Sequence, residues 1–280
     1  LERLLETTGR NFRSTIHRTT AEAAFGLGEN DPDPSIGKPF DIVLFGNVLS
    51  ELADPVAVCS AALDVLASDG SVVALAPADK ETAMSLREVE RAVTTRHETA
   101  PSVYAPTLRL WPNRTPDDRG WSFDVREDLD VPAFQRQLDV VATRAADDEP
   151  GEFVNVDVQF AYSILRPDGE RRVDVRASAD RCARMADAES HVTDRVNLLA
   201  VKLSHNLSDG DNAVYRVGDG SQSVDHYLVC TRETTLNRDL RVAAYGAVVF
   251  VENGLVLWND DEGAYNIVVD DETVVDLVAP

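Results

Sequence analysis

The sequence predicts an α/β fold in which a doubly wound, mostly parallel sheet is followed by a small all-β unit. A strand–helix–strand pattern with short joints occupies residues 40–76. From residue 196 onward the chain reads almost entirely as short strands separated by polar turns. Strand–helix–strand units build parallel sheets, whereas closely spaced short strands are typical of small barrels and sandwiches.

The strand–helix–strand unit has clear local signals. Ile42 to Phe45 form a near-continuous apolar run, which is typical of a strand covered on both faces. Asp54-Pro55 provides a helix N-cap followed by proline at the first helical position. Apolar residues then recur at helical spacing, and Asp69-Gly70 is expected to end the helix. Ser71 to Ala76 form the second apolar strand.

The next residues predict the rest of the first domain. In order, we expect a helix capped by Asp79 and running to about Arg96, an irregular proline-rich stretch, a strand, a helix, a β-hairpin and a last helix. The last five have the bounds 100–120, 121–126, 131–146, 154–176 and 177–191.

The remaining residues predict a β-rich domain. Its seven expected strands are 196–203, 213–217, 226–231, 240–251, 255–258, 265–269 and 273–278. Asn253-Gly254 predicts a type I′ hairpin turn between the fourth and fifth of them. A five-stranded, OB-like barrel is the favoured form, because such barrels often serve in nucleic-acid binding. The chain is therefore divided into a first domain at 1–178 and an OB-like domain at 190–280.

The composition is strongly acidic and poor in lysine. The chain has 49 acidic and 27 basic residues, a net charge of −22, and only three lysines. Because the acidic residues are spread over every segment, this composition favours a protein kept soluble in molar salt over one that binds a basic partner. The three cysteines lie far apart and are expected to be buried apolar residues. No segment has the length of a membrane span, so we expect a cytoplasmic protein.

Several stretches resemble one enzyme family. "FDIVLFGNVLSELADP" and "DGSVVALAPADKETAMSLREVERAV" resemble strands four and five of a class I, S-adenosylmethionine-dependent methyltransferase, with the helix between them. "VYAPTLRLWPNRTPDDRGWSFDVRED" and "FVNVDVQFAYSILRPDG" are similar to later segments of the small ribosomal subunit methyltransferase family. The resemblance runs from about Leu1 to Arg176. It implies a Rossmann-like sheet, S-adenosylmethionine as cofactor and small-subunit ribosomal RNA as partner, with neither DNA nor a membrane.

The resemblance also implies where the chain begins within that fold. Leu1 to Leu5 resembles the helix after strand two, and Phe12 to Ile16 would be strand three. The glycine-rich turn that such enzymes carry after their first strand is absent, and Gly26-Leu27-Gly28 reads instead as a helix stop. We therefore expect the first βαβ unit of the fold to be missing from this chain. Weak or absent binding of S-adenosylmethionine follows as an expectation.

The candidate cofactor-binding residues lie after the expected third and fourth strands. Gly46 would let the backbone approach a ligand, Asn47 offers a donor and an acceptor, and Val48 follows them. Thr20 and Glu22 lie where this superfamily often contacts adenine. The alternative is that Gly46 and Asn47 only open a turn and that Glu22 is a solvated helix residue. No catalytic residue is assigned.

The family's iron–sulfur segment has lost its cysteines in this chain. Thr107 stands at the first cysteine position, Trp111 near the second, and Ser122 at the third. Because such clusters need thiolates, no cluster or other metal is expected.

Arginines and tryptophans alternate in the same segment. Arginine beside an exposed aromatic ring can pair with phosphate and stack on bases of single-stranded RNA. The candidate RNA contacts are Arg109, Trp111, Arg114, Arg119 and Trp121. The alternative is a buried tryptophan with arginines paired to nearby aspartates.

Two functions follow from these patterns. One is methyl transfer from S-adenosylmethionine to small-subunit ribosomal RNA. The other is a non-catalytic, RNA-binding protein of ribosome assembly, favoured by the lost cluster ligands and the lack of a visible catalytic group.

Overall fold

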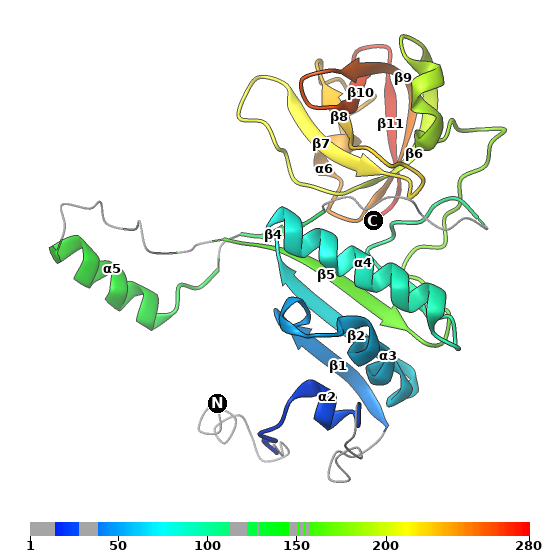
Figure 1. Cartoon of the computed structure of the whole chain (residues 1–280). Helices are drawn as coiled ribbons and strands as arrows, with labels where there is room; N and C mark the ends of the chain where they lie inside the picture. The colour runs from blue at the N-terminus through cyan, green and yellow to red at the C-terminus, as the bar shows by residue number, and fades with distance from the viewer. Residues whose placement is uncertain are drawn as a thin grey trace.

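The computed structural model describes residues 15–27, 39–112, 122–127, 129–145, 151, 154 and 157–280. They form a mostly β protein with a mixed sheet followed by a closed five-stranded β-barrel (Figure 1). The predicted α/β fold class, with its Rossmann-like sheet, is therefore wrong. The expected elements at 1–5 and 12–14 lie outside the described residues.

The first sheet is mixed. Its strands are β1 (Phe40–Gly46), β2 (Leu66–Pro77), β3 (Ser102–Ala105), β4 (Asp124–Arg126) and β5 (Val158–Arg166). The order is β1-β2-β5-β3, with β4 also paired to β5. Among these described strands only β1 and β2 run parallel, and every pairing of β5 is antiparallel. The strand–helix–strand unit was thus predicted correctly, but its continuation as a parallel sheet was not.

The core of this sheet lies on one of its faces. Helices α3 (Pro55–Asp64) and α4 (Lys80–Arg96) contact each other and strand β2, and α4 also lies along β5 (Figure 1). Phe45 is buried beneath them, whereas Ile42 and Leu44 on the other side of β1 are 64% and 61% exposed. A doubly wound sheet has helices on both faces, and the described helices do not supply that second layer.

The predicted N-caps of α3 and α4 are confirmed, but α3 ends earlier than the sequence predicts. Asp54 and Asp79 each accept a hydrogen bond at 2.9 Å from the backbone N–H three residues later, so both are the predicted N-caps. The chain enters β2 at Leu66, and Asp69-Gly70 lies inside that strand. A Cβ on Gly70 would lie 2.8 Å from the Phe40 carbonyl oxygen, so this glycine permits close strand approach.

The expected hairpin and the helix after it are also corrected. Gly169 has the left-handed φ of +81° that the predicted turn requires. No strand forms at 170–176, because β5 already pairs on its two sides with β2 and with β3 and β4. The helix expected at 177–191 reduces to a 3₁₀ helix, η2 (Met185–His191). The other helices among the described residues are α2 (Ala21–Ala24), η1 (Leu49–Glu51), α5 (Ala133–Ala145) and α6 (Asp239–Val242).

The second sheet closes on itself. Its strands are β6 (Arg195–Lys202), β7 (Ala213–Gly218), β8 (His226–Cys230), β9 (Val248–Asn259), β10 (Ala264–Val269) and β11 (Val274–Ala279). The order is β10-β8-β7-β6-β9, and a β9–β10 pairing closes the barrel, while β11 pairs with β9 outside it. Ala200, Val217, Leu228 and Val249 fill its interior with almost no exposed surface.

The predicted hairpin turn at Asn253-Gly254 is wrong. Strand β9 runs unbroken through both residues, and the partner register shifts between Val196 and Leu198 of β6. Asn253 has a φ of +63°, so the asparagine forms an irregularity inside a barrel strand rather than a turn between two strands.

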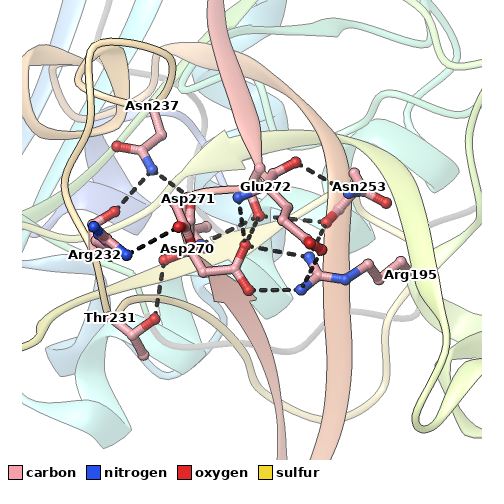
Figure 2. Close-up of polar contacts among 10 residues, drawn as sticks. Arg195, Thr231, Arg232, Asn237, Asn253, Asp270, Asp271 and Glu272 are labelled. Carbon is pink, nitrogen blue, oxygen red and sulfur yellow. Dashed lines mark hydrogen bonds and ion pairs between the residues drawn. The ribbon is translucent and has the colours of Figure 1, made fainter.

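A polar network secures one end of the barrel (Figure 2). The Arg195 guanidinium donates to Asp270 Oδ2 at 2.6 Å and lies 3.2 Å from Glu272 Oε2. This ion pair holds the pKa of Asp270 down at about 2. The Asn237 amide donates to the Asp270 carbonyl at 2.9 Å. The network ties the turn between β10 and β11 to β6 and to the loop before α6.

Candidate nucleic-acid interface

Three of the predicted cofactor-binding residues, Gly46, Asn47 and Val48, lie at the end of β1, where the neighbouring cavity is small. Gly46 is exposed, and the Asn47 N–H donates to the Leu75 carbonyl at 3.0 Å with a φ of +55°. The cavity lined by Asn47 and Val48 measures about 10 Å³, because Leu86 and Val89 of α4 close it. Such a space holds about one water. This cavity is too small to enclose a nucleoside.

Thr20 and Glu22 have a local structural role. Thr20 Oγ1 accepts a hydrogen bond from the Ala23 N–H at 3.2 Å and is the N-cap of α2. Glu22 lies in the first turn of that helix, where a negative charge is favourable. Gly26, with a φ of +71°, follows the helix end as expected. Ala21, Phe25 and Leu27, in and just after α2, pack against the hydrophobic core of the first sheet.

Arg109 and Trp111 lie together at the junction of the two sheets. Both line a cavity of about 220 Å³, together with Thr94, Arg171 and Arg176. We call this space the arginine cavity. The Leu110 N–H donates to the Asp219 carbonyl of the barrel, and the Ala177 N–H donates to the Leu110 carbonyl. These bonds fix the segment that carries Arg109 and Trp111. Arg114, Arg119 and Trp121 lie outside the described residues.

The cations of the arginine cavity exceed the anions that pair with them. Arg176 donates to Asp174 Oδ1 at 3.0 Å, and Arg171 lies 3.7 Å from the same oxygen. Arg109 donates from Nη2 to Thr94 Oγ1 at 3.2 Å and has no carboxylate partner among the described residues. Among the described residues, Asp174 is thus the one carboxylate that pairs with any of these three guanidinium groups.

Burial lowers the pKa of two of these arginines, and neighbouring charges partly oppose and partly reinforce that effect. Burial lowers the pKa of the Arg109 guanidinium, Glu90 partly offsets this, and the charges of Arg91 and Arg171 lower it further. Burial likewise lowers the pKa of Arg171, with Asp174 opposing the effect. An arginine stays protonated in proteins, so these shifts express mainly the cost of burying two charged guanidinium groups. A bound anion would relieve it.

A second, larger cavity is also lined by Trp111. It measures about 710 Å³ and is lined by Trp111, by residues of the 179–191 segment and by the start of β6. Trp111 Nε1 donates to Asp219 Oδ2 at 2.6 Å, and Asp219, which is 1% exposed, also accepts from the Met185 N–H. We call this space the wide cavity.

The sequence reasoning found Arg109 and Trp111 but missed Arg171 and Arg176. Residues 170–176 were assigned to a strand, where alternate side chains would point to opposite faces of a sheet. The available signal was the high density of arginine between residues 166 and 184, with no lysine.

The structure describes all three positions at which the resembled family has its cluster cysteines, Thr107, Trp111 and Ser122. Thr107 is 3% exposed, and its hydroxyl has no hydrogen-bond partner in the structure; Ser122 receives a hydrogen bond from the Tyr245 hydroxyl at 3.2 Å. Within the described ranges, no three histidine, cysteine, aspartate or glutamate side chains gather as metal ligands. The expectation of no cluster stays a prediction.

The comparisons with known proteins concern the barrel. Residues 186–278 match the family model described as domain of unknown function (DUF8157) C-terminal domain. The match runs from η2 to β11 and leaves the first sheet and the arginine cavity outside it. A search of curated proteins finds no match. Among the described residues, no helix combines the length and the apolar character needed to cross a membrane.

Proposed function

We propose that this protein binds single-stranded RNA at the arginine cavity. The observation that carries the proposal is the gathering of Arg109, Arg171 and Arg176 around one cavity in a chain with a net charge of −22. Guanidinium groups match phosphate oxygens in geometry and lose less hydration than an ammonium does on binding. A local excess of arginine within an acidic chain supports an anionic ligand.

Trp111 supports a nucleic acid over a simple anion. Its ring lines the same cavity as the three arginines. Single-stranded nucleic acids are bound by this combination, in which cations follow the phosphates and aromatic rings stack on bases. The choice of RNA over DNA comes from the family resemblance, as does the narrower prediction of small-subunit ribosomal RNA.

Methyl transfer stays an untested prediction. The proposed function does not include methyl transfer, since the fold class that supported it is wrong and the cavity beside Asn47 measures about 10 Å³.

The test is fluorescence anisotropy with a short labelled oligoribonucleotide near physiological ionic strength. We expect Arg109→Gln and Arg171→Gln each to weaken binding about tenfold, because a hydrogen bond to a charged group is worth about 1.5–3 kcal/mol. Arg241→Gln is the matched control, since Arg241 is exposed and lines neither cavity. A DNA strand of the same sequence tests the choice of sugar.

The salt dependence gives a second readout. For single strands, the logarithm of the binding constant falls with the logarithm of salt concentration by about 0.7 per phosphate contacted. Three arginines predict a slope of about −2, and Arg109→Gln should reduce its magnitude by about 0.7. Equal affinities and slopes for Arg109→Gln and Arg241→Gln would overturn the proposal.

A further inference from the structure

Trp111 is the residue that lines both the arginine cavity and the wide cavity. The two spaces therefore lie next to each other at this residue. Their sizes differ: about 220 Å³ on the arginine side and about 710 Å³ on the other. Cavities that enclose organic ligands typically measure about 300–1,000 Å³. The wide cavity has that size, whereas the arginine cavity suits a group as small as a phosphate with part of its sugar.

The indole ring is held in place before any ligand arrives. Its Nε1 donates to Asp219 Oδ2 at 2.6 Å. Asp219 is fixed in turn, because its carboxylate also accepts from the Met185 N–H at 3.0 Å and the Ser221 hydroxyl at 2.6 Å. A ring whose orientation is fixed loses little entropy when a second ring stacks on it. Trp111 is thus prepared as a stacking platform.

The wide cavity also offers polar groups for the edge of a base. Asn197 Oδ1 accepts the Asn253 N–H at 3.0 Å, which leaves the Asn197 amide donors with no acceptor among the described residues. Asp180 and His191 line the same space. By contrast, Arg184 is already paired with Asp187 at 2.8 Å. Arg181 lines this space as well, so two arginines face the two aspartates Asp180 and Asp187, without the cationic excess of the arginine cavity.

We infer that the two cavities bind one nucleotide unit across Trp111, with its phosphate in the arginine cavity and its base stacked on Trp111 in the wide cavity. The inference rests on the proposed function and adds that recognition needs a base as well as a phosphate. The ligand class is a phosphorylated nucleoside within a strand. Inorganic phosphate or a sugar–phosphate backbone without bases should bind much more weakly.

The experiment compares two ligands of equal length and charge, an oligouridylate and the same ribose–phosphate backbone with its bases removed. The native protein should bind the oligouridylate at least about tenfold more tightly, since stacking of one base contributes about that much. Trp111→Ala should abolish this preference and leave binding of the base-free strand unchanged. Arg109→Gln should weaken binding of both ligands equally.

Two further variants guard against a change in folding. Trp111→Phe keeps an aromatic face and should retain most of the base preference. Asp219→Asn keeps the indole ring but replaces the carboxylate that accepts its N–H. It therefore tests whether the base preference depends on the fixed orientation of the ring as well as on the ring itself. In a Trp121→Phe/Trp258→Phe background Trp111 becomes the single tryptophan of the chain, and its fluorescence should be quenched by the oligouridylate alone.

The outcomes separate the two proposals. If Arg109→Gln binds both ligands as the native protein does, RNA binding at this site is wrong. If Arg109→Gln weakens both ligands but the native protein shows no base preference and no Trp111 quenching, RNA binding stands and the nucleotide inference is wrong.

Discussion

Lys202 is a buried cation whose partners are all uncharged. Its side chain is 4% exposed, and its amine donates to the carbonyls of Leu240 and Ala243 at 3.0 and 2.7 Å. The Tyr215 ring lies 4.1 Å from the amine. The two carbonyls belong to helix α6 and its end, where a positive charge is favourable. Burial nevertheless lowers the pKa of Lys202 to about 8.

This shift predicts a pH dependence of stability. Below pH 8 the amine is charged in both the folded and the unfolded chain. Between about 8 and the ordinary value of 10.5 it is neutral when folded and charged when unfolded, so the unfolded state binds more protons and stability rises with pH. In urea unfolding, we expect the native protein to gain stability relative to Lys202→Met across that window. A difference between the two proteins that stays constant from pH 7 to 10.5 would contradict this assignment.

At the same scale, single residues were predictable where their role is local. Asp54 and Asp79 were predicted as N-caps and act on a backbone N–H three residues away, so a short stretch of sequence contains the whole interaction. Arg171 joins Arg109 across 62 positions, through a hydrogen bond from its guanidinium to the Arg109 carbonyl. No local pattern marks such a contact, and this is why half of the arginine cavity was missed.

At the scale of elements, strand β9 shows how tertiary pairing overrides a strong turn signal. Asn-Gly between apolar stretches favours a two-residue hairpin. Here Val248 to Val251 pair with both β6 and β11, and Leu255 to Asn259 pair with β10. One continuous strand satisfies all three neighbours and closes the barrel, which a hairpin at Asn253 would prevent. The glycine remains necessary for a different reason, because the Ile267 side chain packs directly over it.

We expect Gly254→Ala to destabilise the barrel. Its Cβ would lie 2.6 Å from Ile267 Cγ2, and Ile267 is 1% exposed with a stiff, branched side chain. Overpacking of this kind costs about 1–3 kcal/mol. Gly210→Ala is the control in the same domain, since the nearest atom to its Cβ would be the Ser208 hydroxyl at 3.4 Å. Denaturant midpoints measure both, and equal midpoints would show that the barrel accommodates the methyl group.

For the whole molecule, the fold class was mispredicted because one correct unit was extended too far. The parallel pair β1–β2 with α3 between them forms as expected. β1 occupies one edge of β2, and the strand on the other edge decides whether the sheet continues as a parallel one. β5 occupies that other edge and runs antiparallel to β2. The apolar run Ile42–Phe45 also misled the prediction. It reads as a strand buried on both faces, yet Ile42 and Leu44 are largely exposed.

The net charge of −22 makes the whole molecule sensitive to salt. Acidic groups spread over the surface repel one another, and this repulsion favours the expanded, unfolded chain. The Debye length falls from about 30 Å at 0.01 M to about 3 Å at 1 M, so added salt removes most of the repulsion. We expect the thermal midpoint to rise markedly from low to molar potassium chloride. Sucrose at matched osmolality is the control, because it stabilises by exclusion without screening charge. A midpoint that is unchanged by potassium chloride, or raised equally by sucrose, would mean that charge repulsion does not limit stability. It would also contradict the prediction of a protein adapted to molar salt.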